Sequence, residues 1–216
     1  MLATKVLASG ITHLTDARYF AAWEVDYLAF PLGDGVSEAI SWDYLNALRE
    51  WVEGPEIVAE LGKIEDATPW LDILPAQKIN TVLLYGDDSE PAGESFKAAG
   101  IRVITKLDVD RYSKGDDVES DIALLPSTDT YVLTFENYLT YEDLLSGSIL
   151  NPHALKRIAE ANSILVDLNV GKTDPKKIIE DHPIEGFAVR GSSEEKVGYK
   201  SFDDLDDLFE GLEVFV

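Results

Sequence analysis

The sequence predicts a single small (β/α)₈ barrel, and three observations lead to this fold class. Short apolar runs that favour strands recur eight times along the 216 residues, with amphipathic segments between them. The predicted strands start roughly 20–30 residues apart, which is enough for a compact strand–helix unit. Several runs, such as Val82-Leu83-Leu84 and Ile164-Leu165-Val166, are continuously apolar, as in parallel strands covered on both faces. No linker or low-complexity tract interrupts the pattern, so residues 1–216 are predicted to form one domain.

The main rival is a doubly wound open sheet. It is disfavoured because the dinucleotide-binding pattern G-x-G-x-x-G is absent after the first apolar run. The eight strands predicted for the barrel are, in chain order, Lys5–Ile11, Tyr27–Leu32, Glu56–Leu61, Thr81–Tyr85, Arg102–Leu107, Tyr131–Phe135, Ser163–Leu168 and Gly186–Arg190.

Helices are predicted between the strands from apolar stripes and caps. Leu14–Val25 carries an apolar face, and Ser41 is expected to cap a second helix with its own apolar stripe. Asn151-Pro152 and Asp174-Pro175 each read as an N-cap followed by proline at the first helical position.

The remaining helix signals are weaker. Pro91–Ala99 is expected to end at Gly100, and Ser201 with Asp204 resembles a capping box before the last helix. The acidic stretch Asp108–Asp129 is expected to hold only a short helix.

Composition excludes several classes of function. The chain has 41 acidic and 18 basic residues, a formal charge of -23, and no cysteine. Such a charge repels nucleic-acid backbones and anionic membranes, so neither partner is expected. The lack of cysteine excludes disulfides, thiolate metal sites and a thiol nucleophile. No apolar run approaches the ~20 residues of a membrane span or the pattern of a signal peptide, so a cytoplasmic location is expected.

The predicted chemistry lies where strands end, because barrel active sites are built from the loops that follow the strands. Phosphate is often held after the seventh and eighth strands, and Gly171-Lys172-Thr173 and Gly191-Ser192-Ser193 offer glycine amides there. The alternative is that both are ordinary glycine turns before capped helices. The three histidines lie far apart without a second ligand at metal spacing, so neither a metal nor another cofactor is predicted.

Three segments at strand ends carry a recognisable pattern: Ser9-Gly10-Ile11-Thr12, Val82–Asp87 and Gly186–Ser192. They resemble phosphoribosylanthranilate isomerase, a tryptophan-pathway enzyme built as a small (β/α)₈ barrel. The family has Cys-Gly-Ile-Thr, Val-Gln-Leu-His-Gly-Asp and Gly-Val-Asp-Val-Ser-Ser-Gly at these three places. The resemblance implies an Amadori rearrangement of an aminoaldose phosphate to an aminoketose.

The departures from the family fall on its chemistry. The family's general base is the cysteine at the position of Ser9, and its general acid is an aspartate at the position of Thr134, with Glu136 two residues on. The aspartate of the eighth strand falls at Ala188, and the glycine pair after the seventh is replaced around Asp167-Leu168. The resemblance therefore implies an isomerase whose activity is altered or lost.

The resemblance assigns candidate roles to particular residues. Ser9 and Glu136 are the predicted proton-transfer residues. The residues predicted to bind a small phosphorylated sugar-type ligand are Lys106, Gly171, Lys172, Arg190, Gly191, Ser192 and Ser193.

Two other readings remain open. The chain is alternatively a non-catalytic barrel that serves as a ligand-binding or protein-interaction subunit. A third reading has Lys63, Lys106 or Lys172 forming a Schiff base with a carbonyl substrate. The sequence does not fix an oligomeric state.

Overall fold

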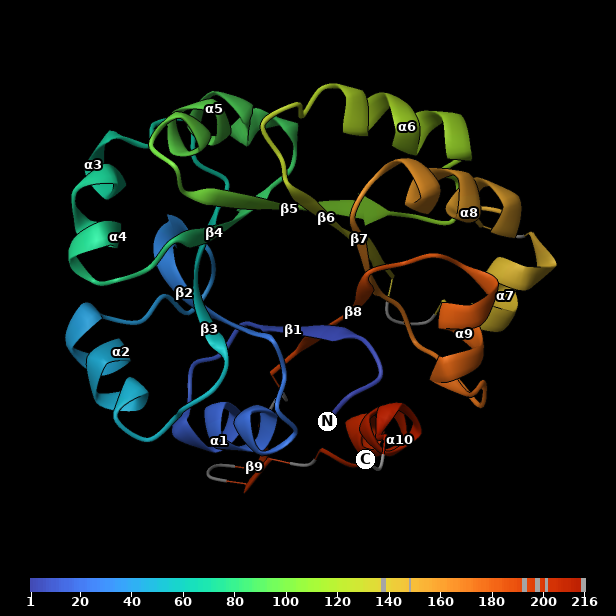
Figure 1. The fold of residues 1–216 in the computed structure, drawn as a ribbon, viewed down its shortest axis with the longest axis horizontal. Coiled ribbons are helices and arrows are strands. Elements are labelled where there is room, and N and C mark those ends of the chain that lie inside the picture. The colour runs from blue at the N-terminus through green and yellow to red at the C-terminus, as the bar shows by residue number, and fades with distance from the viewer. Residues whose placement is uncertain (137–138, 148, 192–193, 197–198, 201, 215–216) are drawn as a thin grey trace.

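Eight parallel strands close into a barrel with helices around it, as the sequence predicts (Figure 1). The computed structural model describes residues 1–136, 139–147, 149–191, 194–196, 199–200 and 202–214. The barrel strands are β1 (Lys5–Ser9), β2 (Tyr27–Gly35), β3 (Glu56–Gly62), β4 (Thr81–Tyr85), β5 (Arg102–Val109), β6 (Thr130–Phe135), β7 (Ile164–Asp167) and β8 (Gly186–Arg190).

The strands pair in chain order, and pairing of β8 with β1 closes the barrel. In this last pair Ser9 stands opposite Arg190. The helices are α1 (Leu14–Ala22), α2 (Trp42–Arg49), α3 (Thr68–Leu71), α4 (Ile73–Ala76), α5 (Glu90–Ala98), α6 (Gly115–Ala123), α7 (Tyr141–Ser146), α8 (Pro152–Ala161), α9 (Pro175–Asp181) and α10 (Asp203–Leu212), with a 3₁₀ turn at Asp87–Ser89. A pair of short antiparallel strands, β9 (Glu194–Lys196) and β10 (Tyr199–Lys200), follows β8.

Several predicted caps are present. Ser41 Oγ accepts a hydrogen bond from the Tyr44 amide at 3.2 Å, and Asn151 Oδ1 accepts one from Ala154 at 2.9 Å. Asp174 Oδ1 accepts one from Lys176 at 2.9 Å. These bonds satisfy amides that have no partner inside the first helical turn. The predicted cap Ser201 lies outside the described residues.

The structure corrects some element boundaries and adds elements. The first strand ends at Ser9, not Ile11, because Gly10 takes a left-handed φ of 67°. The first helix ends at Ala22, and Glu24 turns the chain with a φ of 56°. The expected short helix in the acidic stretch is α6. Helices α3, α4 and α7 have no counterpart among the predicted elements, because each is only one to two turns long.

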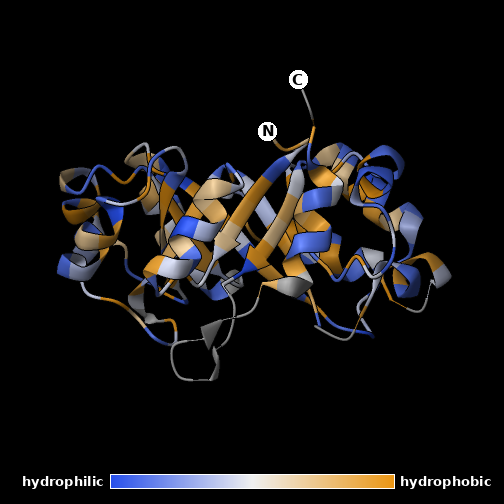
Figure 2. Ribbon diagram, turned by 90° about the horizontal axis from the view of Figure 1, so that it is seen from below, coloured by the Kyte–Doolittle hydropathy of each residue, from blue (hydrophilic) through white to orange (hydrophobic). Residues whose placement is uncertain are grey.

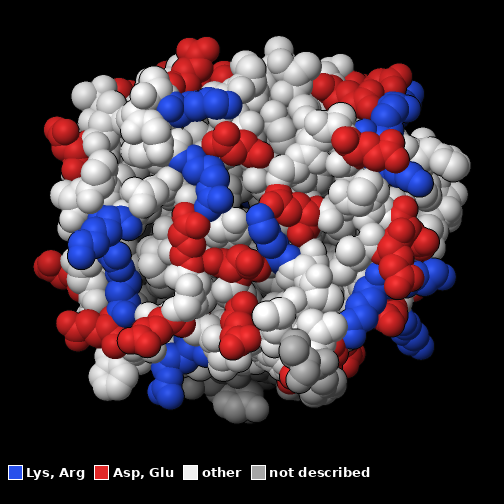
Figure 3. Space-filling model, in the orientation of Figure 1, with Lys and Arg blue, Asp and Glu red and all other residues white. Residues whose placement is uncertain are grey.

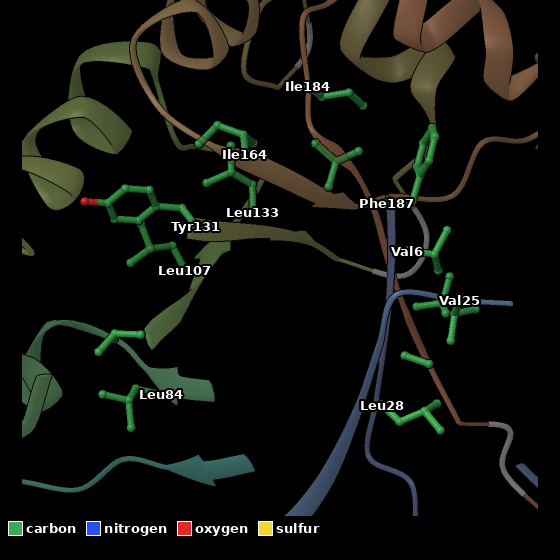
Figure 4. Packing of buried hydrophobic residues seen from close by; sticks show 14 of the residues in the cluster. Val6, Val25, Leu28, Leu84, Leu107, Tyr131, Leu133, Ile164, Ile184 and Phe187 are labelled. Atoms are coloured by element: carbon green, nitrogen blue, oxygen red, sulfur yellow. The ribbon is translucent and has the colours of Figure 1, made fainter. Parts of the chain in front are cut away.

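Apolar side chains form two buried clusters, one between strands and helices and one inside the barrel. Figure 4 shows part of the outer cluster, where Val6, Leu28 and Phe187 project from neighbouring strands. The inner cluster fills the middle of the barrel with side chains from every strand. Its buried members are Leu7, Tyr27, Ala29, Val58, Leu83, Ile104, Val132, Leu165 and Ala188. Figure 2 shows the hydrophobic strands at the centre and hydrophilic residues on outer helix turns.

The end of the barrel where the strands start is closed by polar and charged groups. Lys5 forms an ion pair with Glu185, and Arg102 contacts Glu56 at 2.6 Å and lies 5.1 Å from the centre of the Tyr27 ring. Figure 3 looks onto this end, where basic and acidic side chains lie next to one another. In barrel enzymes of this fold, active sites lie at the opposite end, where the strands end. Among the residues described, every helix is too short or too polar to cross a bilayer.

Candidate active site

The inner positions of the strands change from apolar to polar at their carboxyl ends. Each of the polar positions comes two residues after a member of the inner cluster, so its side chain leaves the same inner face of its strand. We call this set the mouth layer. It consists of Ser9, Glu60, Tyr85, Lys106, Thr134, Asp167 and Arg190.

Glu60 is a buried acidic residue of the mouth layer that accepts hydrogen bonds from two neighbouring segments. Its side chain is only 4% exposed. Its Oε2 accepts a hydrogen bond from the Gly10 amide at 2.7 Å, and its Oε1 accepts one from the Tyr85 hydroxyl. The carboxylate thus connects β3 with β4 and with the loop after β1. Burial raises the pKa of Tyr85, and the negative charge of Glu60 raises it further, so the phenol keeps its proton.

Lys106 is a buried cation in the mouth layer, with 6% of its surface exposed. Its Nζ lies 5.4 Å from the centre of the Tyr85 ring. No side chain of the described residues comes within salt-bridge or hydrogen-bond distance of this ammonium. Burial, and then the positive charge of Arg190, lower the pKa of Lys106, while Asp167, Asp108 and Glu60 oppose that shift.

Asp167 is the acidic counterpart of Lys106. Burial raises its pKa, and the charges of Lys106 and Arg190 offset part of the rise. Asp167 stands in register with Thr134 on β6, and Thr134 stands in register with Asp108 on β5. Thr134 Oγ1 is buried without a hydrogen-bond partner in the described part of the chain. Two carboxyl groups therefore flank the position where the resemblance implies an aspartate.

Ser9 lies where β1 meets β8. Its Oγ donates to the Val189 carbonyl at 3.3 Å, and its own carbonyl accepts from the Gly191 amide at 2.9 Å. A Cβ at position 191 would lie 3.0 Å from the Gly10 carbonyl and 3.3 Å from Oδ2 of the buried Asp16, so glycine permits this close approach. Among the described residues, the Ser9 hydroxyl bonds to a carbonyl and to no basic side chain.

A cavity of about 550 Å³ lies beside the mouth layer, at the ends of β6, β7 and β8 and against α10. Its lining includes Asp167, Gly171, Arg190 and Asp207. The volume suits a small metabolite. The cavity brings together two predicted ligand-binding residues, Gly171 and Arg190, and adds two carboxyl groups to them.

The other predicted site residues are more dispersed. Lys172 lines a neighbouring cavity of about 450 Å³, and the Gly171 amide donates to Asn169 Oδ1 at 2.8 Å. Glu136 is exposed just past the end of β6. Ser192 and Ser193 lie outside the described residues.

Sequence reasoning assigned no role to Glu60, Tyr85 or Asp167. A signal for them does exist in the sequence, because each is a polar residue in step with the inward apolar residues of its strand. Within the described part of the chain, no three histidine, aspartate or glutamate side chains gather closely enough to hold a metal ion.

No model of a protein family matches the sequence, and no curated protein matches it. Solved structures do match the fold. Phosphoribosylanthranilate isomerase from Thermotoga maritima superimposes with a TM-score of 0.71 at 18% identity, covering 97% of this chain and 98% of that one. The Pyrococcus furiosus enzyme gives 0.70 at 13% identity, with coverages of 97% and 98%.

A third structure is a phosphoribosylanthranilate isomerase in complex with reduced 1-(o-carboxyphenylamino)-1-deoxyribulose 5-phosphate. It gives a TM-score of 0.68 at 16% identity and covers 97% of this chain and 98% of that chain. The three matches show that this chain has the barrel fold of these isomerases.

Proposed function

We propose that this chain acts on a small phosphorylated sugar derivative at the carboxyl end of its barrel, by proton transfer of the isomerase type. The observation that carries the proposal is the mouth layer, in which polar groups, most of them titratable, replace the apolar filling of the barrel. The fold it shares with an isomerase that holds a phosphorylated ribulose derivative supports the class of ligand.

The general acid of this proposal is Asp167. The resemblance places the family's acid at Thr134, and Asp167 is the neighbour of Thr134 on the next strand. A carboxyl group with a raised pKa keeps its proton closer to neutral pH, as a general acid must. In this proposal the acid has moved one strand along the barrel.

The general base of this proposal is Lys106. An amine with a lowered pKa gives up its proton more readily, which a base at neutral pH requires. Titratable groups with perturbed pKa values cluster at functional sites, and Lys106 and Asp167 are two such groups in one barrel mouth. Ser9 and Glu136 remain the candidates that the resemblance implies.

Arg190 is the proposed contact for the phosphate group. It lines the cavity of about 550 Å³ and carries a guanidinium, which matches phosphate geometry. The carboxylates of Asp167 and Asp207 line the same cavity and repel an anion that has no hydroxyl groups to donate hydrogen bonds to them. The site is therefore proposed to select its ligand by the sugar hydroxyl groups as well as by the phosphate.

The test is turnover of freshly prepared phosphoribosylanthranilate, followed by fluorescence, together with calorimetric binding of the reduced ribulose 5-phosphate compound. Asp167→Asn is expected to lower turnover by about 10²–10⁴-fold. Asp116→Asn is the matched control, because Asp116 is exposed on α6 and its side chain contacts Arg157 at 3.3 Å. Ser9→Ala and Glu136→Gln, measured in parallel, test the two proton-transfer candidates of the resemblance.

Loss of turnover in Asp167→Asn but not in Asp116→Asn supports the proposal. Turnover that survives in Asp167→Asn and falls in Ser9→Ala rejects the assignment of the acid. Binding without any turnover identifies the alternative, a ligand-binding barrel. Neither binding nor turnover in the folded protein rejects the proposed function.

A further inference from the structure

We propose that Lys106 forms a reversible imine with the carbonyl carbon of an open-chain keto or aldehyde ligand in the mouth of the barrel. The inference rests on the proposed function, because it uses the same opening and the same class of ligand. It replaces the role of Lys106 as a general base with a covalent step that the resemblance does not imply.

The geometry around Lys106 is the first reason. The residue sits on β5 in register with Tyr85 of β4, and its carbonyl accepts the Gly86 amide at 3.0 Å. Its side chain therefore starts from a fixed backbone on the inner face of the barrel. The ring of Tyr85 provides an aromatic wall at 5.4 Å from Nζ.

The lack of a committed partner is the second reason. A lysine that only neutralises a carboxylate sits within salt-bridge distance of it, as Lys63 does at 3.6 Å from Asp88. In the described part of the chain, Lys106 Nζ has neither a salt bridge nor a hydrogen bond, and it is 6% exposed.

Ionisation favours the same residue. A lysine is a nucleophile only when neutral, and burial together with Arg190 lowers the pKa of Lys106. Lys63 has a side chain that is 65% exposed, and Lys172 is exposed as well. Of the three lysines that the sequence brings forward, Lys106 is the one whose surroundings favour the free amine.

The step balances with groups in the mouth layer. The neutral amine adds to the carbonyl carbon, so a C–N bond forms as the C=O π bond breaks, and a proton moves from the nitrogen to the oxygen to give a carbinolamine. Asp167 then supplies a proton to the hydroxyl group, which leaves as water as the C–O bond breaks, and a protonated imine remains beside the Asp167 carboxylate. Return of the nitrogen proton to Asp167 gives the neutral imine and restores the acid, and addition of water reverses the reaction without any oxidant or reductant.

The experiment incubates the full chain with dihydroxyacetone phosphate, adds sodium borohydride, and locates the reduced secondary amine by peptide mass spectrometry. The expected result is labelling of Lys106 in excess of Lys63 by at least about ten-fold. Lys106→Arg should lose this label, and Lys63→Arg, a matched change of an exposed lysine, should keep it. Circular dichroism checks the fold of each variant. If Lys106→Arg does not fold, the position of the label in the wild type decides.

Label that is absent from Lys106, or spread evenly over exposed lysines, overturns the inference. In that case the turnover of Asp167→Asn still tests the proposed function by itself. Label on Lys106 with both dihydroxyacetone phosphate and dihydroxyacetone supports the imine and counts against recognition of the phosphate. The pH dependence of labelling gives a second test. The labelling rate of Lys106 should rise at pH values below the ordinary lysine pKa, where exposed lysines are still protonated and are labelled slowly.

Discussion

The hydrogen bond between Tyr85 and Glu60 should be a measurable source of stability in the mouth layer. The Tyr85 hydroxyl donates to a carboxylate that is 4% exposed and that also accepts from the Gly10 amide at 2.7 Å. Tyr85→Phe removes the donor and keeps the ring beside Lys106. Glu60→Met removes both acceptors at similar volume, and the double variant completes a thermodynamic cycle.

The size of the coupling follows from the chemistry. A hydrogen bond to a charged group contributes about 1.5–3 kcal/mol, roughly twice a neutral one. The Gly10 amide loses its acceptor in both Glu60→Met and the double variant, so this loss cancels from the cycle. We therefore expect the double variant to be less destabilised than the sum of the single variants by about 1.5–3 kcal/mol.

Urea unfolding followed by circular dichroism measures the four free energies of unfolding. The slope of each curve should stay the same, because the fold and the surface exposed on unfolding are unchanged. A coupling energy within about 0.5 kcal/mol of zero would show that the two side chains act independently, and would refute the reasoning.

Three further predictions concern the rest of the barrel. Burial lowers the pKa of His182 below 6.5, so the unfolded chain binds a proton at this histidine more readily than the folded chain. The free energy of unfolding should therefore fall as the pH drops below 6.5, and His182→Gln should make this pH dependence weaker in urea titrations. Gly186→Ala would place a Cβ 1.9 Å from the Lys5 carbonyl oxygen and should lower the free energy of unfolding by more than about 3 kcal/mol. Gly100→Ala, at a φ of 77° with open space around it, should lower it by about 1–2 kcal/mol, and equal losses of thermal stability in the two variants would contradict this. Leu165→Ala empties the centre of the inner cluster and should cost about 2–5 kcal/mol in the same unfolding assay, and a loss under about 1 kcal/mol would mean that the barrel centre is loosely packed.

The eight strands could be predicted from the sequence because each is a short apolar run with a distinct boundary. The runs Thr81–Tyr85 and Gly186–Arg190 match β4 and β8 at both ends. The predicted end of the first strand was wrong because a single backbone angle, the left-handed φ of Gly10, decides where the strand ends. Helices α3 and α4 were missed because four residues are too few to show a helical period.

The candidate site could be predicted only in part. Arg190 and Gly171 were placed in loops that do share a cavity. The roles of Glu60 and Asp167 depend on which face of the strand is inside the barrel. That face is fixed by the register of all eight strands together, and register is a property of the closed sheet and not of any one run. The orientation of a strand-end carboxylate therefore becomes visible only after the barrel is closed.

The pKa shifts of Lys106 and Asp167 indicate that their charges cost the folded protein stability, and perturbed groups of this kind are typical of the proton-transfer site that we propose. The lowered pKa of Lys106 means that the unfolded chain holds its proton more tightly, so stability rises with pH between the lowered value and 10.5. The raised pKa of Asp167 means that the folded chain holds its proton more tightly, so stability falls as pH rises above 3.8 toward the raised value. At neutral pH both charged forms are therefore less favourable in the folded protein than in the unfolded chain.

Replacing both residues should separate stability from function. Because apolar residues of similar volume often match or exceed buried charges in stability by about 1–4 kcal/mol, Lys106→Met combined with Asp167→Leu should unfold at an equal or higher urea concentration than the wild type. The same variant should lose turnover. If the wild type shows no turnover, the variant should lose ligand binding. A double variant that is destabilised by several kcal/mol would mean that the two charges hold the strand ends together. The mouth layer would then be a structural network, and the argument from its cost to its chemistry would fail.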